Sequence, residues 1–308
     1  MKIQFVGAGS AFNKEDGQSN ALVIADNGKK LLIDCGCYCW QFMQQMEPTL
    51  GVTDIEGVYV SHLHADHVGG LEELAFCTYF NPSASKPKLY GNFRLMHDLW
   101  EQSLRGGLES VQAKQMDLDS YFDVLRIPDN GEFIWEGIGF KPVQTVHVVN
   151  DCTIKVSYGL LIRDGMQWTL NKKDTINIGK PQPTVFFTTD TQFCPNQISD
   201  FYARADIIFH DCETSPFKSG VHAHYSELAT LSREAKEKMV LYHYQPNPPQ
   251  KQVLDIEPRK DGNGEVQTRT MPVYEDGFLG FANAAQTFDI TWDEIKQLQG
   301  KVGHTDIS

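Results

Sequence analysis

Short apolar runs follow one another along most of the chain, separated by glycine, proline or polar residues. Runs of about four to eight apolar residues between turn residues are typical of buried strands. The pair Asn27-Gly28 joins two such runs, and Asn-Gly is typical of a hairpin with a type I′ turn. The pattern predicts strands over residues 2–6, 21–25, 30–34, 57–60, 88–90, 122–127, 133–135, 140–145, 156–163, 185–189, 206–211 and 239–242, with those from 122 to 145 antiparallel.

Apolar residues three or four positions apart mark helices between the strands. Asn92 is suited to cap one of them, and Thr291-x-x-Glu294 forms a capping box for a last helix. Strands and helices recur in two similar halves, which favours two packed sheets with helices outside them. The predicted helices cover residues 38–45, 71–80, 93–104, 195–203 and 225–236, and two further hairpins are expected near residues 168–178 and 260–264.

Histidines and an aspartate are concentrated directly after the predicted strand 57–60. His62, His64, Asp66 and His67 lie within six residues, on a strand-to-helix turn. Alternate spacing on an extended segment directs His62 and His64 to the same side, while Asp66 and His67, past the bend, face a second point. Imidazole and carboxylate groups are ligands for zinc and similar divalent ions. The stretch therefore predicts two adjacent metal sites.

The motif His62-x-His64-x-Asp66-His67 resembles the signature of the metallo-β-lactamase superfamily, a large group of mostly dinuclear hydrolases. The resemblance implies an α/β fold, the αββα sandwich of two mixed β-sheets flanked by helices. It also implies two divalent metal ions, with zinc expected and manganese as the alternative. The implied ligands are His62, His64 and His147 for the first ion, Asp66, His67 and His243 for the second, and Asp190 as a bridge between both. In the same way, Asp34 resembles the aspartate that supports the metal loop without binding metal.

Two later stretches, Ile207–Glu213 and Val221–Ser226, resemble the branch that contains the tRNA 3′-processing endonucleases (RNase Z). In that branch a histidine protonates the leaving oxygen and an acidic residue orients the histidine. The resemblance implies His224 as the general acid and Asp211 as its partner, with aspartate replacing the glutamate of the family. Asp66 is expected to be catalytic together with His224 and Asp211. His222 and Ser226 are candidates for substrate binding.

The same branch includes phosphodiesterases that act on cyclic phosphates, among them phage-type enzymes that degrade cyclic nucleotide signals (anti-Pycsar enzymes). The stretch Ser157–Leu160, following His147–Asp151, resembles them. RNase Z commonly carries a long arm that grips tRNA between the third histidine and the bridging aspartate. Here only residues 148–189 lie between those positions, so we expect no arm of this kind.

Charge points in the same direction, since 27 Lys and Arg residues stand against 40 Asp and Glu residues, a net charge of −13. Proteins that grip long nucleic acids normally carry a basic stripe, and here the basic residues form only the short pairs 29–30 and 172–173. A small phosphodiester, above all a cyclic nucleotide, is the expected substrate, and long nucleic acid is not expected as a partner. The alternatives are an RNase Z-like endonuclease, a hydrolase of carboxylic esters, thioesters or lactones, and a non-catalytic scaffold.

Cysteine spacing and hydropathy bear on the compartment. The seven cysteines include no CxxC pair, which favours free thiols in a reducing compartment. No apolar run approaches the ~20 residues that span a bilayer, and residues 1–7 read as a strand rather than as a signal peptide. We expect a cytoplasmic homodimeric enzyme with no membrane partner. Residues 1–250 should form the catalytic domain, and residues 251–308 a C-terminal extension packed on it or on a partner subunit.

Overall fold

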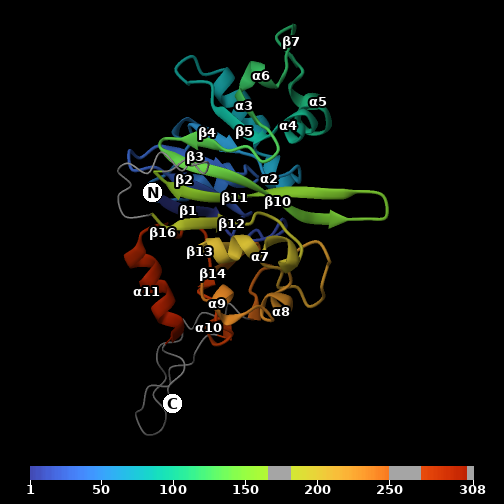
Figure 1. The fold of residues 1–308 in the computed structure, drawn as a ribbon. Coiled ribbons are helices and arrows are strands. Elements are labelled where there is room, and N and C mark those ends of the chain that lie inside the picture. Colours follow the sequence, from blue (N-terminus) through green and yellow to red (C-terminus); the bar gives the residue numbers. More distant parts are fainter. Residues whose placement is uncertain (166–181, 250–271, 304–308) are drawn as a thin grey trace, which may run out of the picture.

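The structure, a computed structural model, describes residues 1–165, 182–249 and 272–303. Two seven-stranded mixed sheets pack face to face at its centre (Figure 1). The first sheet has the order β16 (Thr287–Asp289), β1 (Lys2–Gly7), β2 (Asn20–Ile24), β3 (Lys30–Ile33), β4 (Gly57–Tyr59), β5 (Lys88–Asn92) and β8 (Asp123–Ile127). The second has the order β15 (Gly280–Phe281), β14 (Met239–Tyr242), β13 (Ile207–Asp211), β12 (Thr184–Phe187), β11 (Ile154–Asp164), β10 (Ile138–Val149) and β9 (Phe133–Trp135). A separate two-stranded hairpin consists of β6 (Ser110–Val111) and β7 (Lys114–Gln115).

Alternation along the strands divides the apolar residues between two cores. In β3, Leu31 and Ile33 belong to the core between the sheets, whereas Leu32 belongs to the core beneath the helices of the first sheet. Between the sheets, the ring of Phe5 lies 5.5 Å from that of Phe209 and 5.6 Å from that of Tyr242. Such aromatic contacts across the interface hold the two sheets together.

Helices cover both outer faces (Figure 1). Outside the first sheet lie α1 (Cys39–Met43), the 3₁₀-helix η1 (Val52–Asp54), α2 (Ala65–Val68), α3 (Leu71–Tyr79), α4 (Phe93–Leu99), the π-helix η2 (Trp100–Leu104), α5 (Arg105–Leu108) and α6 (Leu118–Tyr121). Outside the second sheet lie α7 (Pro195–Arg204), α8 (Tyr225–Leu228), α9 (Arg233–Lys236), α10 (Pro272–Glu275) and α11 (Trp292–Gly303). The predicted αββα sandwich is therefore confirmed.

Several local predictions need correction. The strand predicted over residues 122–127 is not an antiparallel neighbour of β9, because β8 pairs in parallel with β5 in the other sheet. The helix predicted over residues 225–236 is interrupted, since Ser232 caps a separate helix, α9. The turn at Asn27-Gly28 is not of type I′, which needs positive φ at both central residues, and here Gly28 has a φ of 84° while Asn27 is not among the residues with positive φ.

The chain after residue 250 contributes to both sheets where it is described. β15 pairs with β14 in the second sheet, and β16 pairs with β1 in the first. The capping box at Thr291 is partly formed, because its hydroxyl accepts a hydrogen bond from the backbone N–H of Glu294 at 3.2 Å. The hairpins predicted near residues 168–178 and 260–264 lie outside the described residues.

All seven cysteines are free. Among the described residues, no helix combines the length and the apolar character that crossing a bilayer requires.

Candidate metal centre and adjoining pocket

Parallel strands bring the predicted site residues to one edge of the sandwich. β3 and β4 run parallel in the first sheet, as do β12, β13 and β14 in the second. Polar residues lie at or just beyond the carboxyl ends of these strands, where open α/β sheets bind their ligands. They are Asp34 after β3, the segment 61–67 after β4, Asp190 after β12, Asp211 at the end of β13 and His243 after β14.

His147 reaches the same edge through a β-bulge. Val146 of β10 pairs with Val156 of β11, but Val148 pairs with Lys155, so that His147 is the extra residue on its strand. A bulge re-aims the side chain that it contains and is frequent beside active sites.

The first group of candidate ligands consists of three imidazoles and one carboxylate. Nδ1 of His64 lies 3.1 Å from Nε2 of His62 and 3.0 Å from Nε2 of His147. Oδ2 of Asp190 lies 3.6 Å from the His62 nitrogen and 3.7 Å from the His147 nitrogen. These four ligand atoms surround one point.

The second group shares the same carboxylate oxygen. Nε2 of His67 lies 3.2 Å from Oδ2 of Asp66 and 3.3 Å from Oδ2 of Asp190. Nε2 of His243 lies 3.5 Å from each of those two oxygens. Oδ2 of Asp190 is therefore the atom where the two groups meet.

The spacing of these atoms fits metal ions. Ligands about 2.0–2.1 Å from a tetrahedral zinc ion lie about 3.3 Å from one another, and the separations above run from 3.0 to 3.7 Å. Nε2 of His67, Nε2 of His243 and Oδ1 of Asp190 are buried and make no hydrogen bond. Buried polar atoms are seldom left without a partner, and a divalent ion would supply one. The donor set therefore fits a pair of metal ions.

Residues behind the candidate ligands hold them in place. The Asp34 carboxylate accepts hydrogen bonds from the Ser61 backbone N–H at 2.8 Å and the Ser61 hydroxyl at 2.6 Å. Its Oδ2 also lies 2.8 Å from Nδ1 of His67, and this contact turns the other ring nitrogen toward Asp66 and Asp190. A Cβ atom at Gly36 would overlap the carbonyl of Asp66, so glycine permits this close approach. The predicted supporting role of Asp34 is thus visible in its contacts.

Burial and charge set the protonation of the cluster. Burial lowers the pKa of His147 to about 4 and the pKa of His62 well below its usual value, which leaves neutral imidazoles. Burial likewise lowers the pKa of His64, and Lys155 acts on it in the same direction. For His67, burial opposes the charge, but Asp190, Asp66 and Asp34 outweigh it and raise the pKa. Neutral imidazoles and ionised carboxylates are the forms that bind metal, so His62, His64 and His147 are ready to bind, whereas His67 would release a proton when an ion binds.

Three non-glycine residues around this centre have positive φ angles. Asp34, Thr189 and His243 have φ angles of 59°, 52° and 65°. These values lie in the left-handed region, which non-glycine residues seldom adopt, and a β-branched threonine is a particular outlier there. Asp34 and His243 directly follow β3 and β14, and Thr189 lies two residues after the end of β12. Strain of this kind is frequent at functional sites.

The structure corrects the predicted pairing of Asp211 with His224. Oδ2 of Asp211 lies 2.8 Å from Nδ1 of His222, not from His224. His224 points elsewhere, since its Nδ1 lies 2.8 Å from the Ser226 hydroxyl and its Nε2 lies 2.9 Å from the Ser215 carbonyl. His224 is therefore the N-cap of α8, and its Nδ1 accepts a hydrogen bond from the backbone N–H of Ser226 at 3.2 Å. His222 lies against the candidate metal centre, with its ring 4.4 Å from that of His243 and 5.1 Å from that of His147.

Asp211 is fully buried, and its Oδ2 also accepts a hydrogen bond from the Thr191 backbone N–H at 2.8 Å. Burial disfavours the charged form of His222, but the Asp211 carboxylate outweighs it and raises the pKa of His222 to about 9. The Asp211–His222 pair therefore holds a proton next to the centre.

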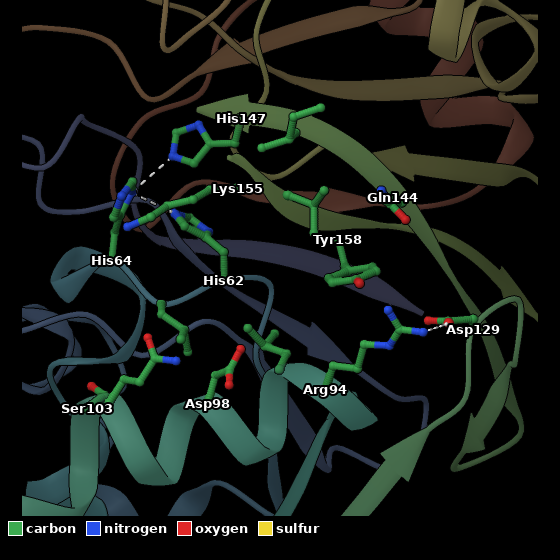
Figure 2. Close-up of a pocket in the computed structure, with 15 residues that line it drawn as sticks. His62, His64, Arg94, Asp98, Ser103, Asp129, Gln144, His147, Lys155 and Tyr158 are labelled. Atoms are coloured by element: carbon green, nitrogen blue, oxygen red, sulfur yellow. Dashed lines mark hydrogen bonds and ion pairs between the residues drawn. The ribbon is translucent and has the colours of Figure 1, made fainter. Parts of the chain in front are cut away.

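A pocket of about 610 Å³ opens beside the first group of ligands (Figure 2). His62, His64 and His147 form one end of it. Figure 2 shows Asp98 and Ser103 rising into it from the helices below, and Tyr158 and Gln144 facing it from the β10–β11 hairpin.

Some contacts of this site could not be predicted from the sequence. Ser157 places its hydroxyl 3.4 Å from Nδ1 of His62 and 2.8 Å from the hydroxyl of Thr189. Lys155 and Asp98 line the pocket only because the bulged hairpin and α4 face each other across it. Their positions depend on tertiary packing and not on a local motif.

Comparison with known proteins identifies the family. The sequence profile of the family described as Anti-Pycsar protein Apyc1 matches residues 1–266. The chain belongs to this family. The Apyc1 protein of Paenibacillus harenae is 36% identical over 248 residues, which cover 79% of this chain and 90% of that protein. The Apyc1 protein of Bacillus phage vB_BveM-Goe7 is 34% identical over 255 residues, which cover 80% and 90%.

Solved structures of more distant proteins share the fold. The metallo-β-lactamase-fold protein YhfI from Bacillus subtilis has a TM-score of 0.62 and 16% identity, covering 94% of this chain and 99% of that one. A diphosphatase from the PhnP family has a TM-score of 0.62 and 15% identity, covering 94% and 98%. The short form of human tRNase Z has a TM-score of 0.58 and 16% identity, covering 94% and 99%. The Apyc1 family member described here is thus a metallo-β-lactamase-fold enzyme, a metal-dependent hydrolase of the phosphodiesterase class.

Proposed function

We propose that this enzyme hydrolyses a small cyclic phosphodiester, a cyclic nucleotide, at the centre around Asp190. The observation that carries the proposal is the Asp211–His222 pair. This pair lies next to two groups of candidate metal ligands that share one carboxylate oxygen. Hydrolysis of a cyclic diester consumes one water and breaks one P–O bond, and the departing alkoxide needs a proton. A protonated histidine held by a buried carboxylate next to the reacting centre is suited to supply it.

The ligand sets follow from the two groups described above. His62, His64 and His147 would hold one divalent ion, Asp66, His67 and His243 the other, and Asp190 both. Zinc suits these nitrogen and oxygen donors, and manganese is the alternative. When bound, two such ions supply an activated water nucleophile and offset the charge that develops on the phosphate.

The chain's own residues supply the remaining functions. His222 gives its proton to the leaving oxygen, and Asp211 keeps the ring oriented and charged until then, since its carboxylate lies 2.8 Å from Nδ1. Within the described residues, Nε2 of His222 makes no hydrogen bond and is therefore free to act as the donor atom. Asp34 orients His67, and the Val221 carbonyl, 3.1 Å from Nδ1 of His147, orients His147.

Size and charge support a small substrate. The pocket of about 610 Å³ lies within the range of about 300–1,000 Å³ that is usual for sites of small ligands. The net charge of −13 disfavours long nucleic acid. The family resemblance to enzymes that degrade cyclic nucleotide signals favours a cyclic nucleotide among small diesters.

The test is a comparison of substrates with metal-replete protein. Cyclic mononucleotides, a tRNA precursor, a lactone and bis(p-nitrophenyl) phosphate are incubated in parallel, and products are separated by chromatography. We expect ring opening of cyclic mononucleotides to nucleoside monophosphates, abolished by Asp190→Ala. Cleavage of the tRNA precursor or the lactone, with cyclic mononucleotides left intact, would replace this proposal by one of the alternatives.

Assembly and location stay predictions of the sequence. A homodimer is tested by light scattering on the purified protein, where a single species of the monomer's mass of 34.8 kDa would contradict it. A cytoplasmic location is tested by fractionation of cells that express the protein.

A further inference from the structure

The pocket beside the candidate metal centre contains a cation that the proposed mechanism does not use. Arg94 and Lys155 both line the pocket. Nη2 of Arg94 lies 3.3 Å from Oδ2 of Asp129, so the charge of Arg94 is already paired. Lys155 makes no ion pair with any carboxylate in the described parts of the chain. The protein as a whole has a net charge of −13 and repels anions, so an unpaired ammonium group in a pocket marks a local place where an anion can bind.

The bulge at His147 fixes where this ammonium group begins. Lys155 pairs with Val148, directly past the bulge that carries His147. Side chains two residues apart on a strand project to the same side, so Lys155 shares a side of β11 with Ser157. The Ser157 hydroxyl lies 3.4 Å from Nδ1 of His62, which shows that this side faces the candidate metal centre. Figure 2 shows the Lys155 side chain extending to the end of the pocket where His64 lies.

We propose that Lys155 binds a non-bridging phosphate oxygen of the substrate and holds the diester against the centre. This assignment rests on the proposed function, since it places the phosphate between Lys155 and the candidate metal ligands around Asp190. A lysine ammonium group offers three donors and a compact charge, which suits a phosphate oxygen. The phosphate gains negative charge as water adds to phosphorus, so Lys155 stabilises the transition state more than the ground state.

The rest of the substrate then has a defined direction. With the phosphate at the end formed by His64, the sugar and base lie along the remaining pocket, between Tyr158 on one side and α4 with η2 on the other. The π-turn of η2, in which the Arg105 backbone N–H bonds the Trp100 carbonyl, extends this wall. π-turns inside helices are frequent at functional sites. Lys155 thus sets the orientation in which the nucleoside meets that wall.

The experiment compares Lys155→Met with Lys155→Arg and with a matched control, Lys141→Met. Lys141 lies on β10, six residues before His147 and so about 20 Å along the strand. Both methionine variants remove one positive charge, but only one removes it from the pocket. Each protein is loaded with metal, and its metal content and circular dichroism are measured first.

Lys155→Met should lower kcat/KM for a cyclic mononucleotide about tenfold to a hundredfold, the usual range for losing a hydrogen bond to a charged group. It should raise the inhibition constant of the matching nucleoside monophosphate by a factor in the same range. Inhibition by the uncharged nucleoside should stay unchanged, which a general disturbance of the pocket would not produce. Lys155→Arg should restore most of the loss, and Lys141→Met should match the wild type.

Equal kcat/KM and equal inhibition constants for Lys155→Met and Lys141→Met would overturn the assignment and leave the proposed function intact. Equal losses for the nucleoside and its monophosphate would also overturn it, because Lys155 would then support the pocket and not the phosphate. Wild-type enzyme that cleaves no phosphodiester would instead overturn the proposed function, and this assignment with it.

Discussion

Nδ1 of His222 lies 2.8 Å from Oδ2 of Asp211, while His224, two residues further on, is bonded at both ring nitrogens to Ser226 and Ser215. The two histidines therefore have different tasks. His222 is held by a buried carboxylate next to the candidate metal centre, and His224 caps a helix. This difference allows a matched pair of variants.

His222→Ala should reduce turnover of a cyclic nucleotide by about a hundredfold to ten-thousandfold, the usual contribution of a general acid. The loss should be much smaller for bis(p-nitrophenyl) phosphate, because p-nitrophenolate leaves without a proton. The measurement is kcat for both substrates, with metal content determined for each protein.

His224→Ala is the control. It should leave turnover of both substrates near the wild-type value and should lower stability by about 1 kcal/mol, the typical effect of losing an N-cap. A larger loss of turnover in His224→Ala than in His222→Ala would contradict the assignment. So would an equal loss for both leaving groups in His222→Ala.

Asp190→Ala should lose more metal than any variant of a single histidine, because Oδ2 of Asp190 lies within 3.7 Å of ligand atoms from both groups. Elemental analysis should find about two ions per chain in the wild type and less than one in Asp190→Ala. His243→Ala should retain the ion of the other group. Wild-type occupancy in Asp190→Ala would mean that the bridge is assigned wrongly.

The ligand groups could be predicted because their signals are local. His62, His64, Asp66 and His67 follow one strand in a fixed spacing, and Asp190 ends another apolar run. Parallel strands place such ends at one edge, so the convergence seen in the structure follows from topology.

The choice between His222 and His224 could not be predicted in this way. Both lie on the same extended stretch, and sequence spacing alone gives them the same orientation. The backbone decides, because Glu213 exchanges hydrogen bonds with Ala223 and Tyr225 on either side of His224. That pairing joins two loops that are distant from each other along the chain, and no local sequence pattern predicts it. The bulge at His147 and the position of Lys155 across from it depend on strand register in the same manner.

Asp34→Asn should weaken metal binding about tenfold to a hundredfold, the usual effect of changing a residue that orients a metal ligand. Two donors of Ser61 and Nδ1 of His67 converge on the Asp34 carboxylate. An asparagine amide accepts through one oxygen only, so one donor would face an NH₂ group. Affinity is measured by competition with a chromogenic chelator. Asp123→Asn, an exposed carboxylate of the same sheet, is the control, and equal affinities for the two variants would contradict the supporting role of Asp34.

Removal of metal should lower the melting temperature of the wild type by several degrees. Asp66 and Asp190 are buried side by side with five imidazoles, and atoms at their centre have no hydrogen-bond partner within the described structure. An ion that binds only the folded chain stabilises it by mass action, by about 4 kcal/mol at a thousand times its Kd. Differential scanning calorimetry before and after dialysis against a chelator measures the change. Asp190→Ala, already poor in metal, should melt at the same temperature in both conditions, and an equal shift in the two proteins would show that the chelator acts elsewhere.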